Sequence, residues 1–424
     1  MFSELANMET LDERYRKLYE EIGRRIVPTA IKQYIKNSGK KVSELVKEEK
    51  FAGYLFAKPV TGATVQLSNK CDKNCKICYL GEKKNDYEMS EDEAKRVRDE
   101  ILRCNLPNVC LTDCEPFMTP NLMDIFVEES KRFSTSIVTN GYPGRNSKKE
   151  AAESFRQLKA MGWNFKKIKS DYFGFGTYPM LGISCDSFHG KDSLQRTINT
   201  LHGLKTAFSK GGEVEIRYTT KRFKKVFDKT DPVFDQITGS INYFFPLIDN
   251  ALELEGFDLV GRTKNFNIAF SPADARYVGN NLSYAPKKEK PKNVRDIGFS
   301  PESREVISID CHGNVRYGHD LSCAPGFEFG NVHEKPLDEM IWEMYKDPLV
   351  QAFKTGGVKY LYFLYQQAIP GFSASSAEKC DLCSKLRNDA DSRERVREFF
   401  KEKMHENPFF VYHNYLENLG ELYK

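Results

Sequence analysis

Three cysteines in the stretch Cys-Asp-Lys-Asn-Cys-Lys-Ile-Cys-Tyr have the residue type and the spacing for metal chemistry. They are Cys71, Cys75 and Cys78, in the pattern C-x3-C-x2-C. Three thiolates this close can ligate three irons of a cubane iron–sulfur cluster, which leaves the fourth iron without a protein ligand. An open iron can bind a small chelating molecule directly, whereas a cluster with four cysteine ligands cannot. The spacing therefore predicts a 4Fe–4S cluster with one reactive iron.

A zinc site or a chance grouping is the alternative interpretation of this triplet. Zinc takes four ligands, and the fourth is usually a cysteine or histidine at short spacing. The next cysteine in the sequence is Cys104 and the first histidine is His189. The lack of a nearby fourth ligand in the sequence favours the iron–sulfur interpretation.

A second set of cysteines lies in the last third of the chain, and two of its members form a C-x2-C pair. The set comprises Cys311, Cys323, Cys380 and Cys383. Four thiolates satisfy either a closed iron–sulfur cluster or a structural zinc site, and free thiols are the third possibility. A disulfide framework is not expected, because clustered cysteines in a cytosolic chain more often bind metal or do redox work.

Composition and charge narrow the functional classes. The 424 residues are 40% hydrophobic and 29% charged, which is ordinary for a globular protein. The net charge of +4 is small and acidic residues stand between the lysines, so we expect no nucleic-acid partner. No run reaches the roughly 18 apolar residues of a membrane span, and the acidic start lacks the apolar core of a secretory signal. We therefore expect a cytoplasmic protein without a membrane partner.

The elements that must position the triplet alternate between strands and helices from about residue 62. Strands are predicted at 63–67, 108–113, 135–140, 180–186 and 213–220. Helices are predicted at 91–103, 121–133, 148–160 and 193–207, and Ser90 with Glu93 forms a capping-box signature. Repeated units of this length favour a parallel sheet, open or closed as a barrel. In such folds the chemistry lies at the C-terminal ends of the strands.

The remaining segments predict further parts around this core. Residues 8–50 have helical periodicity, 241–245 could be a last barrel strand, and His312-Gly313-Asn314 is typical of a hairpin turn. Helices are expected at 335–354 and 389–404. The predicted division is an N-terminal helical extension at 1–60, an α/β barrel at 61–270, a linker at 271–300, a small α+β domain at 301–390 and a helical tail at 391–424.

The triplet and the strand ends that follow it resemble the radical S-adenosylmethionine (SAM) superfamily. That family carries C-x3-C-x-aromatic-C after the first strand of a partial (β/α)6 TIM-like barrel. Ile77 stands at the usual aromatic position, and Glu115-Pro116 ends a segment similar to Gly-Gly-Glu-Pro, with Asp113 and Cys114 in place of the glycines. Thr139-Asn140-Gly141 and Ile183-Ser184-Cys185-Asp186 resemble the family's third and fourth strand ends.

This resemblance implies a set of SAM-binding residues. They are Ile77, Glu115, Asn140, Ser184, Asp186 and Arg196. Glu115 would bind the methionine amino group, Ser184 and Asp186 the ribose hydroxyls and amino group, and Arg196 the carboxylate. Helix capping is the alternative role for Ser184 and Asp186, and a solvated helix face is the alternative for Arg196. Cys114 is a weak catalytic candidate, as a hydrogen-atom donor, against a role in packing.

The C-terminal region resembles the auxiliary-cluster extension called SPASM, or its shorter form called twitch. The resemblance lies in the strand–turn–strand around Cys311 and in a segment that includes Gly330, Asn331 and Trp342. Gly318 occupies a usual cysteine position, and four cysteines remain, which implies one auxiliary 4Fe–4S cluster rather than two. The fold class implied overall is an α/β partial (β/α)6 TIM-like barrel, with an N-terminal helical extension and a C-terminal small α+β auxiliary-cluster domain.

The resemblance also implies the activity. A radical SAM enzyme takes an electron from a donor such as flavodoxin or ferredoxin, cleaves SAM to a 5′-deoxyadenosyl radical, and abstracts a hydrogen atom from its substrate. A peptide substrate in natural-product maturation is expected, with a thioether, a carbon–carbon crosslink or an epimerised residue as the product. The alternative is a small molecule such as a sugar, aminocyclitol or amino acid, and a non-enzymatic metal or scaffold protein is a third reading.

Overall fold

The computed structural model describes part of the 424-residue chain in detail. The described residues are 60–73, 75, 78, 86–112, 114–165, 179–185, 191–208, 213–220, 253–255, 258–262, 267–274, 306–318, 327–373, 389–406, 410–411 and 414. Residues 1–59 of the N-terminal extension predicted at 1–60, and the strand predicted at 241–245, lie outside these ranges.

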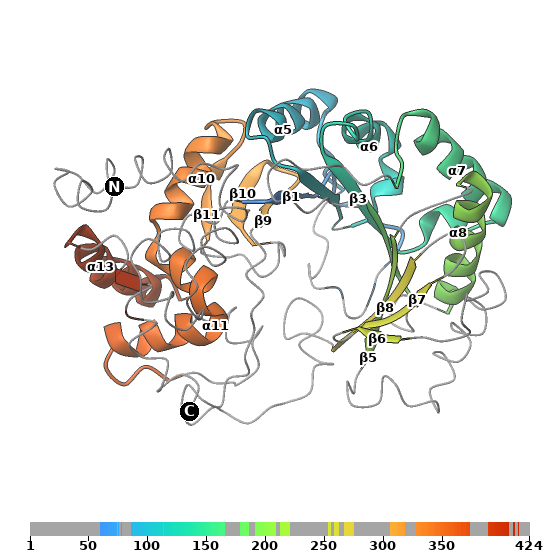
Figure 1. The fold of residues 1–424 in the computed structure, drawn as a ribbon. Coiled ribbons are helices and arrows are strands. Elements are labelled where there is room, and N and C mark those ends of the chain that lie inside the picture. The colour runs from blue at the N-terminus through green and yellow to red at the C-terminus, as the bar shows by residue number, and fades with distance from the viewer. Residues whose placement is uncertain are drawn as a thin grey trace, which may run out of the picture.

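An open, curved sheet of eleven strands forms the frame, in the order β11-β10-β9-β1-β2-β3-β4-β5-β8-β7-β6 (Figure 1). Its central six strands run parallel to one another. They are β1 (Gly62–Val65), β2 (Asn108–Leu111), β3 (Ser134–Thr139), β4 (Met180–Ser184), β5 (Glu213–Thr220) and β8 (Asn267–Asp274). In the described part of the chain the end strands β11 and β6 do not pair, so the six parallel strands make the predicted partial TIM-like barrel.

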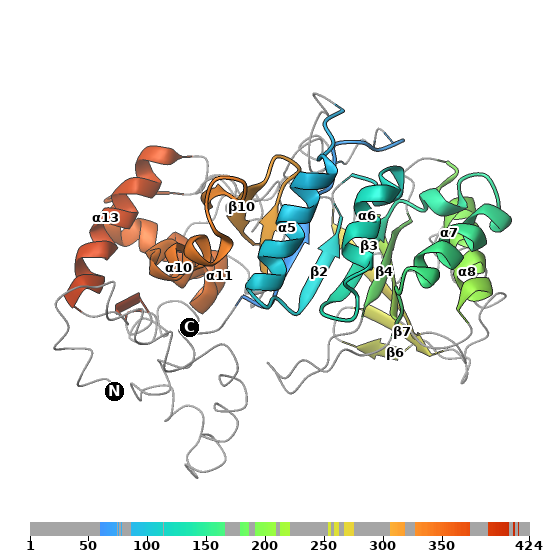
Figure 2. The same cartoon turned by 90° about the horizontal axis from the view of Figure 1, so that it is seen from above.

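Four helices cover the outer face of these strands and carry the chain from one strand to the next (Figure 2). They are α5 (Glu91–Arg103), α6 (Pro120–Val127), α7 (Lys148–Ala160) and α8 (Ser193–Ala207). Alternate strand residues such as Val65, Leu111 and Ile183 are fully buried beneath them. Each helix buries one stripe of apolar residues against that face. The alternate strand residues and these helix stripes together form the core.

The start of α5 forms as its sequence predicts. The Ser90 side chain accepts a hydrogen bond from the Glu93 N–H, and the Glu93 carboxylate accepts one from the Ser90 N–H. Ser147 caps α7 by accepting from the Glu150 N–H. These caps satisfy amide groups that have no partner within the helix, which sets where each helix begins.

The sixth barrel strand differs from the expectation. It is β8, which pairs in parallel with β5 and runs through Asp274, four residues into the range predicted as linker. Between β5 and β8 in sequence lie β6 (Glu253–Glu255) and β7 (Asp258–Arg262), which extend the sheet as antiparallel strands. Helix α6 ends at Val127, whereas 121–133 was expected, because residues 128–133 form hydrogen-bonded turns that lead into β3.

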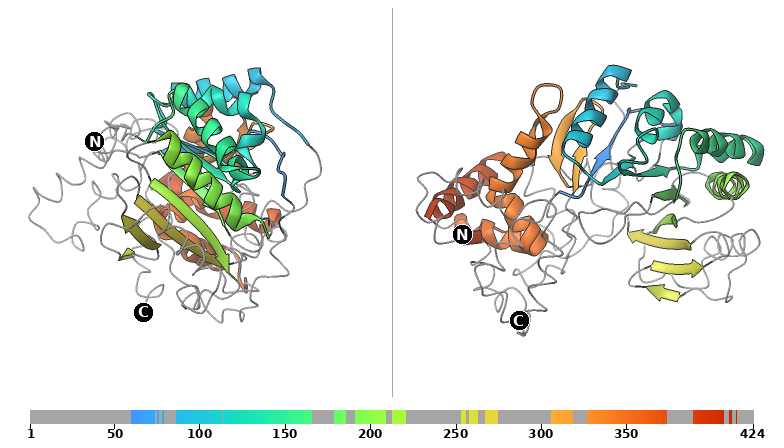
Figure 3. Two further views of the ribbon diagram at one scale, coloured as in Figure 1. Left: turned by 90° about the vertical axis from the view of Figure 1, so that its right-hand side faces the viewer. Right: turned by 45° about the horizontal axis from the view of Figure 1, so that its top comes forward.

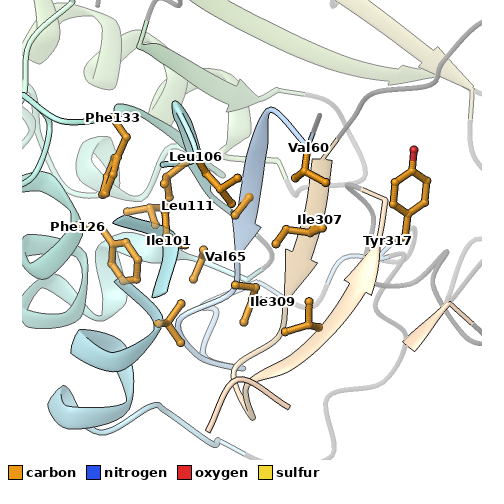
Figure 4. Close-up of a cluster of buried hydrophobic side chains, with 14 of the residues drawn as sticks. Val60, Val65, Ile101, Leu106, Leu111, Phe126, Phe133, Ile307, Ile309 and Tyr317 are labelled. Atoms are coloured by element: carbon orange, nitrogen blue, oxygen red, sulfur yellow. The ribbon is translucent and has the colours of Figure 1, made fainter. Parts of the chain in front are cut away.

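The predicted hairpin continues the barrel sheet at its other side. It consists of β9 (Val306–Ile309) and β10 (Asn314–Tyr317), and β11 (Glu328–Asn331) pairs with β10. β9 lies parallel to β1, with Ala63 opposite Ile307 and Val65 opposite Ile309. Figure 4 shows Val65, Ile307 and Ile309 in one buried cluster.

Three helices follow at the β9–β11 side of the sheet (Figures 1 and 3). They are α10 (Leu337–Lys346), α11 (Pro348–Ala368) and α13 (Ala390–Glu406). The single helix expected at 335–354 is divided at Asp347 and Pro348, because proline has no amide hydrogen and starts the next helix. In the described part of the chain, no helix has the length and apolar character that a membrane crossing requires.

Candidate functional site

The predicted site residues gather at the C-terminal edge of the parallel strands. The cysteine loop follows β1, Glu115 follows β2, Asn140 follows β3 and Ser184 ends β4. Neighbouring parallel strands bring their C-terminal ends to one edge of a sheet, so residues far apart in sequence meet there. Of the predicted SAM-binding residues, Ile77 and Asp186 lie outside the described residues.

The three thiols of the triplet are all half-buried on this edge. The Cys78 N–H donates to the Cys75 carbonyl at 3.0 Å, so the backbones of the second and third cysteines are in contact. Within the described residues, no three His, Cys, Asp or Glu side chains are grouped as for a metal ion. A cubane cluster takes one thiolate at each of three separate irons, so its three sulfur ligands do not converge on a single metal ion. The residue types of the triplet therefore fit a cluster.

An amide group supports the first of these thiols. The Asn140 Nδ2 lies 3.5 Å from the Cys71 Sγ, as a hydrogen-bond donor to sulfur. The same nitrogen donates to the Asp72 Oδ1 at 2.9 Å. Hydrogen bonds to ligand sulfurs orient a metal centre's ligands and tune its reduction potential. Asn140 therefore lies beside the first cysteine of the triplet, and its predicted contact with SAM stays a prediction.

The other side of Asn140 presents an unused acceptor. Its Oδ1 is buried and has no hydrogen-bond partner among the residues that the structure describes. Buried polar atoms of this kind are rare in folded proteins, because leaving one unpaired costs about 1–3 kcal/mol. An acceptor beside a ligand cysteine suits a bound molecule that brings its own donor, such as an amino or hydroxyl group.

Glu115 is buried between the ends of β2 and β3, with a relative exposure of 1%. Its carboxylate accepts from the Thr139 hydroxyl at 2.9 Å, the Asn140 N–H at 2.8 Å and the Phe117 N–H at 3.2 Å. Burial raises the pKa of Glu115 to about 7, although these hydrogen bonds act in the opposite direction. The carboxylate thus ties the two strand ends together, and its predicted contact with a methionine amino group stays a prediction.

Arg196 lies in the first turn of α8. Its side chain is only 12% exposed, which argues against the alternative that it lies on a solvated helix face. Its Nη1 donates to the Asp72 Oδ2 and its Nε to the Asp192 Oδ2, each at 2.5 Å. The Lys73 Nζ donates to the other Asp192 oxygen, also at 2.5 Å. The predicted carboxylate-binding residue is thus already held by two carboxylates of this chain.

Two further thiols flank the start of the cysteine loop. The Gln66 Nε2 lies 3.6 Å from the Cys114 Sγ and donates to the Asn69 Oδ1 at 2.8 Å. The Cys311 Sγ lies 3.5 Å from the same Asn69 oxygen. Burial raises the pKa of the Cys311 thiol to about 12. The polar pair Gln66 and Asn69 therefore connects a thiol at the end of β2 with a thiol at the end of β9.

Sequence reasoning missed the residues that hold the site residues in place. They are Gln66, Asn69, Asp72, Lys73 and Asp192. The one available signal was the pair of opposite charges, Asp72 and Lys73, between the first two cysteines. Of the second cysteine set, only Cys311 lies within the described residues, and Cys323, Cys380 and Cys383 do not.

Comparison with known proteins gives one family and several similar structures. Residues 65–172 match the family described as the Radical SAM superfamily. No curated protein matches the chain. Among solved structures, Streptococcus suis SuiB bound to precursor peptide SuiA is 13% identical, with 77% of this chain and 76% of that chain covered and a TM-score of 0.43.

Two other solved structures are similar at the same level. Native anSMEcpe with bound AdoMet and Kp18Cys peptide is 10% identical, with 81% of this chain and 99% of that chain covered and a TM-score of 0.40. BtrN in complex with AdoMet and 2-DOIA is 14% identical, with 67% of this chain and 82% of that chain covered and a TM-score of 0.35. The family match begins at the last residue of β1 and covers the cysteine triplet, β2, β3 and the Glu115 contacts, so this part of the chain is similar to the radical SAM superfamily.

Proposed function

We propose that this protein is a radical SAM enzyme that reductively cleaves S-adenosylmethionine to a 5′-deoxyadenosyl radical and removes a hydrogen atom from a peptide. The product would be a thioether, a carbon–carbon crosslink or an epimerised residue in natural-product maturation. The observation that carries the proposal is the contact of Asn140 with Cys71, the first of three half-buried thiols, together with a buried Asn140 Oδ1 that has no hydrogen-bond partner among the described residues.

Cys71, Cys75 and Cys78 would hold the 4Fe–4S cluster, which supplies the electron that breaks the carbon–sulfur bond of SAM. Asn140 orients the Cys71 sulfur with its amide nitrogen and offers its carbonyl oxygen to a donor on the bound SAM. Glu115 holds the Asn140 backbone in place through the Asn140 N–H. The rigid support of Asn140 fixes the geometry that radical chemistry needs.

The remaining predicted contacts complete the proposed SAM site. Ser184 is half-buried at the end of β4, on the edge where the thiols lie, and is proposed to bind the ribose. Arg196 is proposed to bind the carboxylate. Ile77 and Asp186 are proposed to bind the adenine and the ribose on the strength of the sequence resemblance.

We also propose one auxiliary 4Fe–4S cluster on the second cysteine set. Cys311 is buried directly after β9, and β9 pairs with β1, so this thiol lies one strand away from the cysteine loop. A cluster there would be close to the proposed radical site and could relay or accept an electron. The other three ligands would be Cys323, Cys380 and Cys383.

The C-terminal segment favours a peptide over a small molecule as the substrate. Its similarity to SPASM extensions, which often belong to peptide-modifying enzymes, includes Gly330 and Asn331, and both have structural roles here. Gly330 has φ +130°, and the Asn331 side chain donates to the His312 carbonyl of the hairpin at 2.8 Å. An electron donor such as flavodoxin or ferredoxin would reduce the cluster, and the reducing cytoplasm would keep the thiols from forming disulfides.

An anaerobic assay tests the proposal. The reconstituted, reduced wild-type protein should contain about eight irons per chain for two clusters and release 5′-deoxyadenosine from SAM. Cys75→Ala should lose about half of the iron and all of the 5′-deoxyadenosine, while Cys104→Ala, a buried cysteine at the end of α5, should retain both. A wild-type protein that holds iron and sulfide yet forms no 5′-deoxyadenosine contradicts the proposal.

The same reactions identify the substrate class. With a short peptide encoded beside the gene, mass spectrometry should show a loss of hydrogen or a deuterium incorporated from solvent. Turnover of a sugar, aminocyclitol or amino acid, with the peptide unchanged, would contradict the peptide assignment and leave the radical SAM activity intact.

A further inference from the structure

Four charged side chains join the cysteine loop to the first turn of α8. They are Asp72, Lys73, Asp192 and Arg196, and we call them the loop latch. We infer that the loop latch positions Cys71 for cluster assembly, with Asp72 as its central residue. The inference rests on the proposed cluster, and it concerns residues that are not themselves proposed as ligands of iron.

Asp72 connects two parts of the site because each of its oxygens has a different donor. The Oδ2 accepts from the Arg196 Nη1 and the Oδ1 accepts from the Asn140 Nδ2. That same Asn140 nitrogen lies 3.5 Å from the Cys71 Sγ. A continuous line of contacts therefore runs from α8 through Asp72 and Asn140 to the first ligand sulfur.

Asp192 bonds to the cysteine loop and to Arg196 instead of capping its own helix. It occupies the N-cap position of α8, where an aspartate usually accepts from an amide of its own helix. Here it makes no such side-chain bond. Its two oxygens instead accept from the Arg196 Nε and the Lys73 Nζ. The carboxylate is committed to the loop.

Three of the four side chains in the loop latch are largely shielded from solvent, whereas Asp192 is half-exposed. The side chains of Lys73, Arg196 and Asp72 are 11%, 12% and 20% exposed. Isolated surface ion pairs contribute little to stability, whereas networks of shielded, hydrogen-bonded charges hold a defined geometry. Asp72 and Lys73 lie between the first and second ligand cysteines, so the loop latch holds that half of the loop in place before iron arrives.

A preorganised loop has two measurable consequences. The half-buried thiols of the metal-free protein react more slowly with alkylating reagents than they would in a loop that is not held in place, and the assembled cluster loses iron slowly to a chelator. Changes to residues that orient metal ligands typically weaken metal binding by about 10–100-fold. We therefore expect Asp72→Asn and Arg196→Gln each to speed iron release from the reconstituted full-length protein about tenfold.

The double variant tests whether Arg196 acts through Asp72 or whether the two residues act independently. If Arg196 acts through Asp72, Asp72→Asn with Arg196→Gln should release iron no faster than either single variant, because contacting residues are not additive. Arg156→Gln is the matched control, since it removes one arginine from an exposed ion pair with Glu153 on α7. It should change neither iron release nor thiol reactivity.

Alkylation of the metal-free protein, mapped by mass spectrometry, gives a readout that needs no cluster. In Asp72→Asn, Cys71 and Cys75 should react faster than in wild type, while the buried Cys104 and Cys185 stay protected. Unchanged reactivity of Cys71 and Cys75, or single-variant effects that multiply in the double variant, would overturn the inferred role of the loop latch.

Two further outcomes keep the loop latch and the proposed function apart. If Cys104 and Cys185 become reactive in Asp72→Asn, the variant has lost its fold. Asp192→Asn then tests the inference in its place, because Asp192 is 51% exposed and its replacement should leave the core intact. Asp192→Asn with wild-type reactivity at Cys71 would overturn the loop latch. A wild-type protein that takes up no iron and sulfide would refute the proposed function, and the alkylation rates would still decide the loop latch.

Discussion

At the residue scale, Glu115 is the most constrained ionisable group of the site. The folded protein surrounds its carboxyl group with apolar residues and three donor groups, so solvation by water is replaced by bonds to Thr139, Asn140 and Phe117. Burial dominates, and the pKa rises from 4.5 to about 7. The folded state therefore binds a proton more tightly than the unfolded state does.

This raised pKa predicts the sign of a pH effect on stability. Because the pKa of Glu115 is higher in the folded than in the unfolded state, its contribution is fully present below about pH 4.5 and is lost as the pH rises through about 7. Glu115→Gln removes this dependence. Between pH 5 and pH 8, the free energy of unfolding of the metal-free wild type should fall by about 2 kcal/mol more than that of the variant.

Urea unfolding of both proteins at the two pH values measures this difference. Comparing the variant with the wild type cancels the titration of all other groups. A difference between the two proteins that stays constant from pH 5 to pH 8 would contradict the raised pKa.

The cysteine triplet and the strand-end residues could be picked out from the sequence because their residue types and spacing are typical of a cluster and cofactor site. The structure brings two of them, Cys71 and Asn140, within 3.5 Å of each other. Asp72 and Asp192 could not be predicted, because an isolated aspartate is equally suited to a solvated surface. Their roles depend on partners that the fold brings from a different strand–helix unit, since Arg196 of α8 bonds to Asp72 and Lys73 of the cysteine loop bonds to Asp192.

At the element scale, α7 and α8 pack so closely that a glycine is required between them. A Cβ at Gly203 would lie 2.5 Å from the Ala151 Cβ and 2.6 Å from the Ala152 N. Real Cβ atoms do not approach backbone so closely, so any larger residue must push the helices apart. Displacement of α8 would also move Arg196 and Asp192, which lie on its first turn.

We therefore expect Gly203→Val to lower the free energy of unfolding by about 1–3 kcal/mol, as overpacking does. Lys205→Ala, on the exposed face of the same helix, should change it by less than about 0.5 kcal/mol. Denaturant unfolding of the metal-free proteins measures both. Equal stability of Gly203→Val and wild type would show that the helices can separate without cost.

Strand–helix alternation from β1 to α8 could be predicted because strands and helices differ in the periodicity of their apolar residues and are bounded by recognisable capping and turn residues. The start of α5 matches because Ser90 and Glu93 form a local signature. The identity of the sixth barrel strand could not be predicted, since it depends on which strand reaches the edge of β5, and β8 does so after two intervening strands. The pairing of β9 with β1 is likewise a long-range contact without a local signal.

At the scale of the whole molecule, that pairing joins the C-terminal region to the barrel in one sheet. The chain has two tryptophans, Trp163 and Trp342. Trp163 is buried behind β3 and donates to the Thr135 carbonyl, whereas Trp342 lies on α10. Variants with a single tryptophan therefore report on the barrel and on the C-terminal region separately.

Because one sheet spans both regions, the two fluorescence transitions should coincide in denaturant, as two-state unfolding requires. Ile309→Ala removes fully buried apolar surface on β9 and should lower both midpoints together, with a loss of about 2–5 kcal/mol. Trp163→Phe and Trp342→Phe without the Ile309 change serve as the references. A shift seen by Trp342 alone would show that the C-terminal region unfolds independently.

The position of β1 between β9 and β2 also has a consequence for synthesis. The ribosome makes β1 early, but its second neighbour is more than two hundred residues away in sequence. At about 5–20 residues per second, the nascent chain carries β1 as an open edge for on the order of ten seconds or longer. An unpaired parallel strand is a template for wrong pairing, so the growing polypeptide is exposed to aggregation, and to capture by chaperones, until its last third emerges.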